Sequence, residues 1–432
     1  MRAAWVVAHR WIGLAMAAFL VLTGVTGAII SWDHELDDLL NPHLLKSASK
    51  GEHLSPLSLL ERFERENPKA RVTFAPLAPE PGDSLALFIT PRVDPATGRQ
   101  HELGYNQVFI DPVSGRELGR REWGGVWPIT RENVVSFLYK LHFSLHLPEM
   151  WGIDRWGQWL LGAIALAWTL DCFIGFYLTL PRGGTRWWQR WKPAWRVRTA
   201  AGARLLSYKL NFDLHRAGGL WTWGLLVVIA FTAFSLNLFF EVFYPAMSKI
   251  SQLTPTPFHQ RAPLERHSPI EPRLSYAQVV EKAKDEAGRR GWKEPAGSAF
   301  YAPEWGIYGV QFFHPGDDHG AAGVGPARLY YDGIDGRYLG DLQPWKGTAA
   351  DIFVQAQFPV HSGRILGLPG RILISIMGLV VAALSVTGVV IWWRKRRAAA
   401  LRSATQSQPQ ASHAHPTGGE EAWLKSEYER SP

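Results

Sequence analysis

Cysteine and charged residues are scarce in this chain. Its 432 residues include a single cysteine, Cys172, and charged residues make up 19% of the sequence. One cysteine excludes an intramolecular disulfide, a zinc site built from cysteines and a covalently attached c-type haem, which needs a CxxCH motif. Soluble proteins contain about 25% charged residues, so the deficit argues against an ordinary cytosolic enzyme.

Two catalytic signatures are also missing. The segment 323–326 lacks the third glycine and the following helix of a dinucleotide-binding loop. The segment 101–105 has a tyrosine where an HExxH zinc hydrolase needs its second histidine. We therefore expect no nucleotide or flavin site in the chain itself, and a zinc-dependent membrane hydrolase is a weak alternative.

Long apolar runs are what the sequence has instead. The window 11–30 contains no charged residue, and at twenty residues it can cross a bilayer core of about 30 Å. Three further windows, at 156–180, 219–243 and 372–393, contain at most one charge each. The mean hydropathy of −0.09 is too low for a protein that is nearly all membrane. Four membrane helices with large water-exposed segments fit better.

Basic residues set the predicted orientation. Eight arginines and lysines and no acidic residue lie between 181 and 210, and four more basic residues follow the last window at 394–397. The positive-inside rule places both stretches, and both termini, in the cytoplasm. The formal net charge of +8 largely reflects this asymmetry, so no nucleic-acid partner is expected. The two long segments between the windows then lie outside, in the periplasm of a Gram-negative cell.

The chain has the pattern of one unit used twice. Each external segment has an amphipathic stretch, at 56–67 and at 275–290, followed by short β-rich runs that end in a hairpin at 108–118 and at 329–339. A His-Arg pair opens the first and third windows, and a histidine precedes the second and fourth. Such internal repetition predicts a duplicated architecture.

Histidines lie at both faces of the predicted membrane region. His9 and His215 open the first and third helices on the cytoplasmic side, and His142, His146 and His361 precede the second and fourth helices outside. Neutral imidazole is a good ligand for haem iron, and two histidines at matching depth can hold one b-type haem. A lone histidine at a helix end is more often interfacial. The matched positions in both halves nevertheless favour two haem layers.

Several residues around these histidines keep alternatives open. His142 and His146 are four residues apart, which predicts one shared helix face, so either could reach His361. The same spacing suits zinc, and His34 is a lower-ranked ligand. Asp171 is costly inside a membrane and should face the bundle interior, in a haem-ligand network, a proton path or a structural hydrogen bond. Small residues that would let a flat macrocycle approach the backbone are Gly13, Gly24, Gly27, Gly378 and Gly388.

Four segments resemble the PepSY-associated transmembrane family of iron-regulated inner-membrane proteins. They are the stretches 9–14, 32–42, 141–146 and 361–395, and the likeness covers nearly all of residues 1–397. The resemblance implies four transmembrane helices, two α+β PepSY-like periplasmic domains and two b-type haems. Together with the positions described above, this gives His9, His215, His142 and His361 as the expected haem-iron ligands, with His146 and His34 as further candidates and no other catalytic residue assigned.

The resemblance also implies an activity. Characterised siderophore reductases of this family reduce ferric iron held by a siderophore on the periplasmic side, so we expect a ferric-siderophore oxidoreductase. Its electron donor would be a quinol or a cytoplasmic reductase. The alternative is a non-enzymatic membrane protein whose PepSY domains bind a peptide or regulate a protease.

The predicted fold class is a mainly α membrane protein built as two repeated halves, with two α+β external domains. Membrane helices are expected at 1–32, 156–180, 219–243 and 371–397. The external domains span 33–155 and 244–370, a basic loop and the start of the third helix span 181–218, and a disordered cytoplasmic tail spans 398–432.

Overall fold

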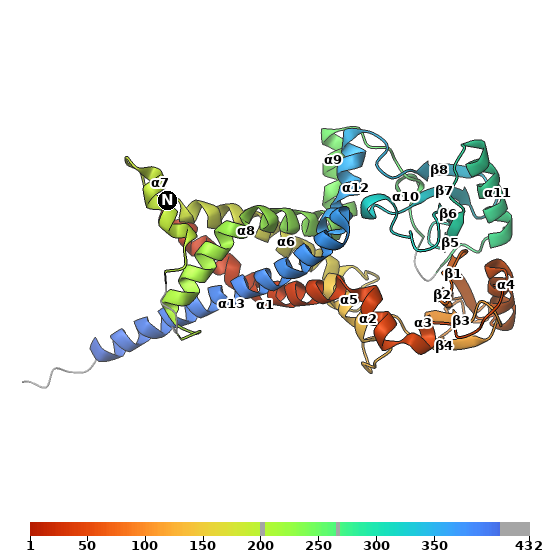
Figure 1. The fold of residues 1–432 in the computed structure, drawn as a ribbon, viewed down its shortest axis with the longest axis horizontal. Coiled ribbons are helices and arrows are strands. Elements are labelled where there is room, and N and C mark those ends of the chain that lie inside the picture. The colour runs from red at the N-terminus through yellow and green to blue at the C-terminus, as the bar shows by residue number, and fades with distance from the viewer. Residues whose placement is uncertain (199–203, 265–267, 407–432) are drawn as a thin grey trace, which may run out of the picture.

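Four long apolar helices form a bundle at one end of the molecule, and a β-sheet lies at the other end (Figure 1). The computed structural model describes residues 1–198, 204–264 and 268–406. Both the length and the composition of the four helices suit a membrane span, which makes the chain a multi-pass membrane protein. These helices are α1 (Arg2–Ile30), α6 (Trp156–Thr179), α8 (Tyr208–Asn237) and α13 (Gly367–Gln406).

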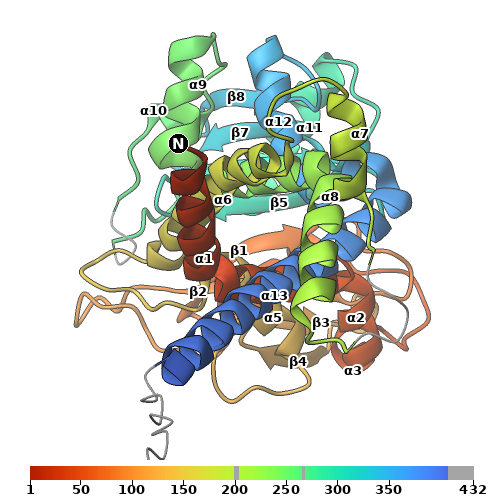
Figure 2. The same ribbon diagram turned by 90° about the vertical axis from the view of Figure 1, so that its left-hand side faces the viewer.

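The bundle has two distinct ends. We call the end that carries the sheet the sheet end, and the other, where α1 begins and α13 ends, the terminal end (Figure 1). Figure 2 looks along the bundle from the terminal end, with the sheet behind the four helices. Gly24 and Gly378 bring α1 and α13 into backbone contact, because a methyl group on either would overlap the carbonyl oxygen of the other. The buried side chains between the helices include Met16, Leu20, Leu226, Met377 and Val381.

Two membrane helices are longer than the sequence predicts. The helix α8 begins at Tyr208, two turns before His215, because the Ser207 hydroxyl caps it by accepting a hydrogen bond from the backbone N–H of Leu210. The helix α13 continues to Gln406 through the alanine-rich stretch 398–400, and alanine is the best helix former. The prediction of disorder from residue 398 is therefore wrong for 398–406, and the rest of the tail lies outside the described residues.

The eight strands found in the described part of the chain belong to one antiparallel sheet in the order β4-β3-β2-β1-β5-β6-β7-β8. The β-rich runs of both external segments thus form two four-stranded meanders, which meet where β1 pairs with β5 through Phe74 and Phe300. The strands are β1 (Ala70–Pro76), β2 (Leu85–Pro91), β3 (Gln107–Ile110), β4 (Glu117–Arg121), β5 (Ala296–Ala302), β6 (Ile307–Phe312), β7 (Ala327–Asp332) and β8 (Tyr338–Leu342).

The two meanders share one hydrophobic core. Helices α4 (Pro56–Glu66) and α11 (Tyr276–Arg289) cover the face of the sheet that points away from the bundle (Figure 1). Apolar side chains from both helices and from strands of both meanders form a single buried cluster. The Tyr276 hydroxyl of α11 donates a hydrogen bond of 3.1 Å to the Val72 carbonyl of β1, which ties one half to the other. The external segments therefore do not have separate cores.

Both predicted hairpins are present and close in the same way. In the β3–β4 turn, the Asp111 carboxylate accepts backbone hydrogen bonds from Val113 and Ser114, and Gly115 has a φ of +69°. In the β7–β8 turn, the Asp332 carboxylate accepts equivalent bonds from residues 334 and 335, and Gly336 has a φ of +70°. Glycine fits both turns because positive φ strains other residues.

Short helices connect the sheet to the bundle. On the first half these are α2 (Asp33–Leu40) and α3 (Pro42–Leu45), which follow α1, and α5 (Val134–Ser144), which leads to α6. On the second half a π-helical turn at Phe239–Phe243 leads into α9 (Tyr244–Ile250) and α10 (Pro257–Gln260), and α12 (Ala349–His361) leads to α13. The remaining short helices are α7 (Trp187–Trp191), Lys192–Trp195, Ala321–Gly323 and Arg364–Leu366.

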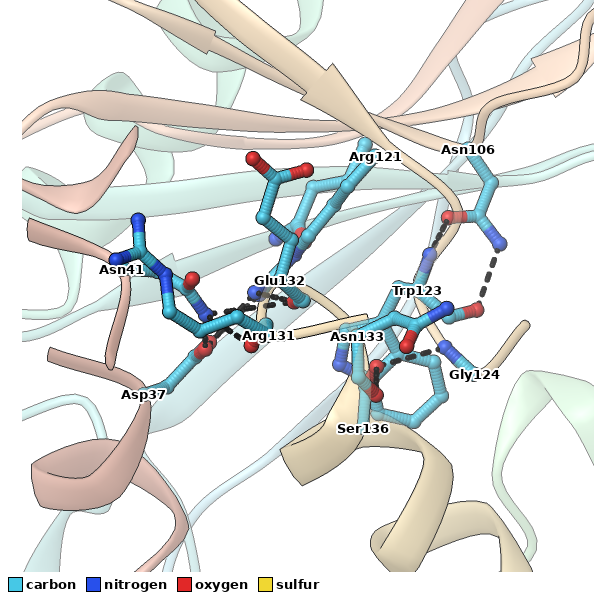
Figure 3. A network of polar contacts seen from close by, with 11 residues as sticks. Asp37, Asn41, Asn106, Arg121, Trp123, Gly124, Arg131, Glu132, Asn133 and Ser136 are labelled. Carbon is cyan, nitrogen blue, oxygen red and sulfur yellow. Dashed lines mark hydrogen bonds and ion pairs between the residues drawn. The ribbon is translucent and has the colours of Figure 1, made fainter. Parts of the chain in front are cut away.

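A buried arginine joins the sheet edge to two of these helices (Figure 3). Arg121, at the end of β4, binds both carboxylate oxygens of Asp37 on α2, at 2.7 and 2.9 Å. It also donates to the Gln107 side chain and to the backbone carbonyl of Glu132, just before α5. The Arg121 side chain is only 4% exposed, so its charge depends on these partners.

Removing the carboxylate partner should destabilise the protein strongly. We expect Asp37→Ala to lower the free energy of unfolding by about 3–5 kcal/mol, because it leaves a buried guanidinium without its counter-ion. A matched control is Glu117→Ala on the same strand. Glu117 pairs with the neighbouring Arg120 at the surface, and such pairs contribute about 0–1 kcal/mol. Unfolding of the purified protein in detergent measures both; equal effects of the two variants would contradict the expectation.

Candidate functional site

Two histidines from different membrane helices face each other at the terminal end of the bundle. His9 lies on α1 and His215 lies on α8, and their ring centroids are 6.1 Å apart with the planes inclined by 58°. Because α8 begins at Tyr208, His215 lies two turns inside the helix rather than at its mouth. The structure thus brings together the two histidines that the sequence places at the start of the first and third membrane windows.

A second pair of histidines lies at the sheet end. His142 is in the last turn of α5 and His361 is the last residue of α12, and their ring centroids are 6.4 Å apart with the planes inclined by 48°. Both side chains reach back onto membrane helices, since His142 contacts α1 and His361 contacts α8. His9 and Thr26, the contact of His142, are both on α1, so the helical rise places the two pairs about 25 Å apart.

Three of the four imidazoles use the same kind of hydrogen-bond partner. The Nδ1 of His142, His361 and His215 lies 3.0, 2.9 and 3.1 Å from a threonine hydroxyl. In each case the backbone carbonyl three residues before that threonine also faces the ring nitrogen. The threonines are Thr26 on α1, Thr232 on α8 and Thr387 on α13.

The fourth imidazole has a different partner. The Nδ1 of His9 lies 2.9 Å from a carboxylate oxygen of Asp171 on α6. The Asp171 side chain is 5% exposed and that of His9 is 31% exposed. Asp171 therefore faces the bundle interior, as its position in an apolar window predicts, and it belongs to the network around the histidines.

Glycines make room beside the rings. A Cβ atom built on Gly175 would lie 3.4 Å from Cε1 of His9, and one built on Gly388 would lie at the same distance from Cε1 of His215. A Cβ built on Gly27 would come within 2.9 Å of the His142 ring. One helical turn after His9 and His215, Gly13 and Gly219 have open space where a side chain would project.

This arrangement fits the requirements of a metal ion bound between two imidazoles. Metal–imidazole bonds are about 2 Å long, so two rings on opposite sides of one ion have centroids about 6 Å apart. Both pairs have that separation. When Nδ1–H donates to an acceptor, the lone pair of the ring is on Nε2 and is free to bind a metal ion. Metal-binding histidines are normally held by such a hydrogen bond from the other ring nitrogen. The open space at Gly13 and Gly219 suits a flat macrocycle next to the backbone. Both pairs therefore fit haem iron.

The histidine pairs do not have the number of ligands that is typical of a structural zinc site. Among the described residues, no group of three or more histidine, cysteine, aspartate or glutamate side chains could hold a metal ion. A structural zinc site normally has four protein ligands, and each of these pairs supplies two.

The prediction that His142 and His146 share a helix face is wrong. The helix α5 ends at Ser144, and the backbone turns left-handed at Leu145 and His146, with φ of 54° and 52°. His146 instead stacks on the Phe137 ring and its Nε2 lies 2.9 Å from the Phe137 carbonyl. Burial lowers the pKa of His146 below its usual value. Of the two histidines, His142 is the one that faces His361.

His34 also lies apart from both pairs. Its ring contacts His319, from the β6–β7 loop, with centroids 5.3 Å apart. His319 in turn contacts Arg364, which begins the turn after His361, and burial lowers the pKa of His319. This small cluster links the sheet to the sheet end of the bundle, and His319 has no motif that marks it in the sequence.

The threonines that contact the imidazoles are not marked by the sequence, whereas Asp171 is. A threonine in a membrane helix normally bonds to its own backbone, so nothing singles out Thr26 or Thr232. One signal does exist: Thr26 follows His9 at the same spacing as Thr232 follows His215. Aligning the two halves on these histidines would have found both threonines.

The fold and the site define a four-helix membrane protein with an external sheet and paired histidines at each end of the bundle. The family described as the PepSY-associated TM region matches residues 6–395. The match covers well over half of the chain, so the protein belongs to the PepSY-associated transmembrane family. Among curated proteins, the comparison finds no match to this chain.

The threonine acceptors should contribute to stability. We expect Thr26→Val to lower the free energy of unfolding by about 1 kcal/mol, because the buried imidazole of His142 keeps only a carbonyl as its acceptor. Thr23→Val is the matched control, since the Thr23 hydroxyl bonds to Phe19 in its own helix and to no imidazole. Thermal unfolding in detergent compares the two variants; an equal loss in both would show that the contact with His142 adds nothing.

Proposed function

We propose that the protein is a haem b-containing inner-membrane reductase that passes electrons across the membrane and reduces ferric siderophore iron to Fe(II) in the periplasm. The observation that carries this proposal is the presence of two imidazole pairs, each with the ring separation expected for two ligands of one metal ion, at opposite ends of one membrane bundle. Membership of the PepSY-associated transmembrane family supports a membrane protein of this class.

The histidines would hold one haem at each end. His9 and His215 would be the ligands at the terminal end, and His142 and His361 those at the sheet end. When bound in this way, haem b supplies reversible one-electron chemistry between Fe(III) and Fe(II). The threonine and carboxylate acceptors would keep each Nδ1 protonated and each Nε2 free, and the apolar bundle would exclude water from both sites. The missing CxxCH motif implies that the haems are held without a covalent bond.

Electrons would enter at the terminal end from a quinol or a cytoplasmic reductase. One electron reduces one ferric ion, so oxidation of a quinol by two electrons releases two protons and supports the reduction of two chelated ferric ions. The substrate would receive electrons at the sheet end, below the external sheet.

We also infer the orientation in the membrane. The basic residues between 181 and 210 lie at the terminal end, where the positive-inside rule places the cytoplasm. Aromatic rings gather in the same region, as in the belt of a membrane interface, since Trp187, Trp188 and Trp195 all contact the Trp191 ring. The sheet would then face the periplasm.

We infer further that the two halves are repeats, each with a PepSY-like external unit. Each half has a membrane helix, an amphipathic helix, a four-stranded meander, a short helix with a histidine in its last turn and a second membrane helix. The equivalent pairs Thr26 with Thr232 and Gly175 with Gly388 support the same repeat at the level of single contacts.

Histidine variants test the function directly. Protein purified in detergent should show the absorption spectrum of b-type haem. We expect His215→Ala to remove one haem and His361→Ala to remove the other, while His43→Ala leaves both. His43 is a matched control because it lies at the surface, paired with Glu132.

Reduction of the substrate should distinguish the two haems. Protein reduced by dithionite without oxygen should be reoxidised by a ferric siderophore, with Fe(II) trapped by a ferrous chelator. We expect His361→Ala to slow this step severely while the remaining haem still accepts electrons. A colourless protein, or His361→Ala with full haem and an unchanged rate, would contradict the proposal and favour the peptide-binding alternative.

Cysteine labelling tests the orientation. In a Cys172→Ser background, a cysteine in place of Ser47 should react with an impermeant reagent in intact spheroplasts. A cysteine in place of Ser403 should react only after permeabilisation, because it follows the basic residues at 394–397. Labelling of position 403 in intact spheroplasts would invert the orientation and the direction of electron flow.

A further inference from the structure

The two histidines at the terminal end differ in the groups that face their Nδ1 atoms, because Asp171 places a carboxylate at one of them. Cβ atoms built on Gly175 of α6 and on Gly388 of α13 would lie at the same distances, 3.4 and 3.8 Å, from Cε1 and Nδ1 of their histidines, so the two helices approach the two rings in the same way. In this register Asp171 corresponds to Leu384. Nδ1 of His215 faces the backbone carbonyl of Leu384 and the Thr387 hydroxyl, whereas Nδ1 of His9 faces the carboxylate of Asp171.

The carboxylate is the only charged acceptor among the four. The other three imidazoles have a neutral threonine hydroxyl and a neutral carbonyl. Within the described residues, no arginine or lysine forms an ion pair with Asp171, whose side chain is 5% exposed. Burying such a group costs free energy, so its charge at this place in a membrane bundle calls for a functional reason.

A carboxylate in this position changes the electronic properties of the ligand. It makes the imidazole more basic at Nε2, and its negative charge favours the oxidised, more positive state of the metal ion. The effect is larger inside an apolar bundle than in water, because the local dielectric constant is low. The hydrogen bond does not reach the sheet end, about 25 Å away along α1, and the effect of the charge is much weaker there because it falls with distance.

We propose that Asp171 is a positioning residue that, through His9, lowers the reduction potential of the haem at the terminal end below that of the haem at the sheet end. Electrons then move downhill from the terminal end toward the sheet. This inference rests on the proposed function, and it assigns to one side chain the difference between two otherwise equivalent sites.

A redox titration of the detergent-purified full chain tests the proposal. The α-band absorbance should show two one-electron transitions in the wild-type protein, and His215→Ala should identify the transition of the terminal end by its loss. We expect Asp171→Asn, which keeps an oxygen acceptor and removes the charge, to raise that midpoint potential and leave the other unchanged. Asp171→Glu, which keeps the charge, should retain a low potential.

A control variant separates the local effect from a general change of charge. Asp213, on α8, is also buried at the terminal end, but its carboxylate pairs with Arg216 rather than with an imidazole. We expect Asp213→Asn to shift the potential of the terminal end much less than Asp171→Asn. An equal shift in both variants would overturn the role of the contact with His9.

The other possible results of the redox titration also support or overturn the role of Asp171. Unchanged potentials in Asp171→Asn would overturn the proposal while leaving the haem sites in place. If this variant loses the haem of the terminal end, the titration is repeated with Asp171→Thr, which provides the kind of acceptor that the other three histidines have. If both neutral variants lose that haem, Asp171 serves to hold the ligand and not to set its potential. Absence of haem from the wild-type protein would instead refute the proposed function.

Discussion

An imidazole N–H inside an apolar helix bundle must have an acceptor, and the site is organised around this constraint. Water is not available there, so an unpaired donor would cost about 1–3 kcal/mol. Each of the four histidines therefore turns its Nδ1 toward an oxygen on a neighbouring helix. That bond fixes the tautomer and the direction of the ring, and it leaves both Nε2 atoms of a pair available for one metal ion. Helix register follows from the same bonds.

Much of this was accessible from the sequence because hydropathy and repetition are local signals. The four apolar windows, the two amphipathic helices and both hairpins lie where their patterns predict them. The matched positions of the histidines also predicted that His9 faces His215 and that His361 faces either His142 or His146, and the structure places His142 opposite His361. The similar spacing of these histidines relative to the apolar windows can be recognised without any knowledge of the contacts between helices.

What the sequence did not reveal depends on contacts between distant segments or on single backbone angles. The β1–β5 pairing that merges the two meanders joins residues far apart in the chain, and no local pattern specifies which strand edges meet. Leucine and histidine rarely adopt a left-handed backbone, so the sequence does not predict this conformation at Leu145 and His146. Because of it, His146 does not lie on the same helix face as His142. Acceptors such as Thr387 are recognisable only when the opposing ring is in place.

The two histidine pairs differ in what holds them. At the terminal end both rings are carried by membrane helices, so their separation depends on helix packing alone. At the sheet end both rings come from short helices that are fixed from two sides. The Arg121 network anchors the chain before α5 to the sheet (Figure 3), and on α12 the Asp351 carboxylate binds Thr254 while Gln357 binds Ser235 of α8. The position of His142 therefore depends on the folded sheet, whereas α12, which carries His361, is held by Thr254 and by α8. Because Arg121 joins β4 to Asp37 of α2 and to the carbonyl before α5, a folded sheet edge is a condition for placing the His142 ring opposite His361 at the sheet end.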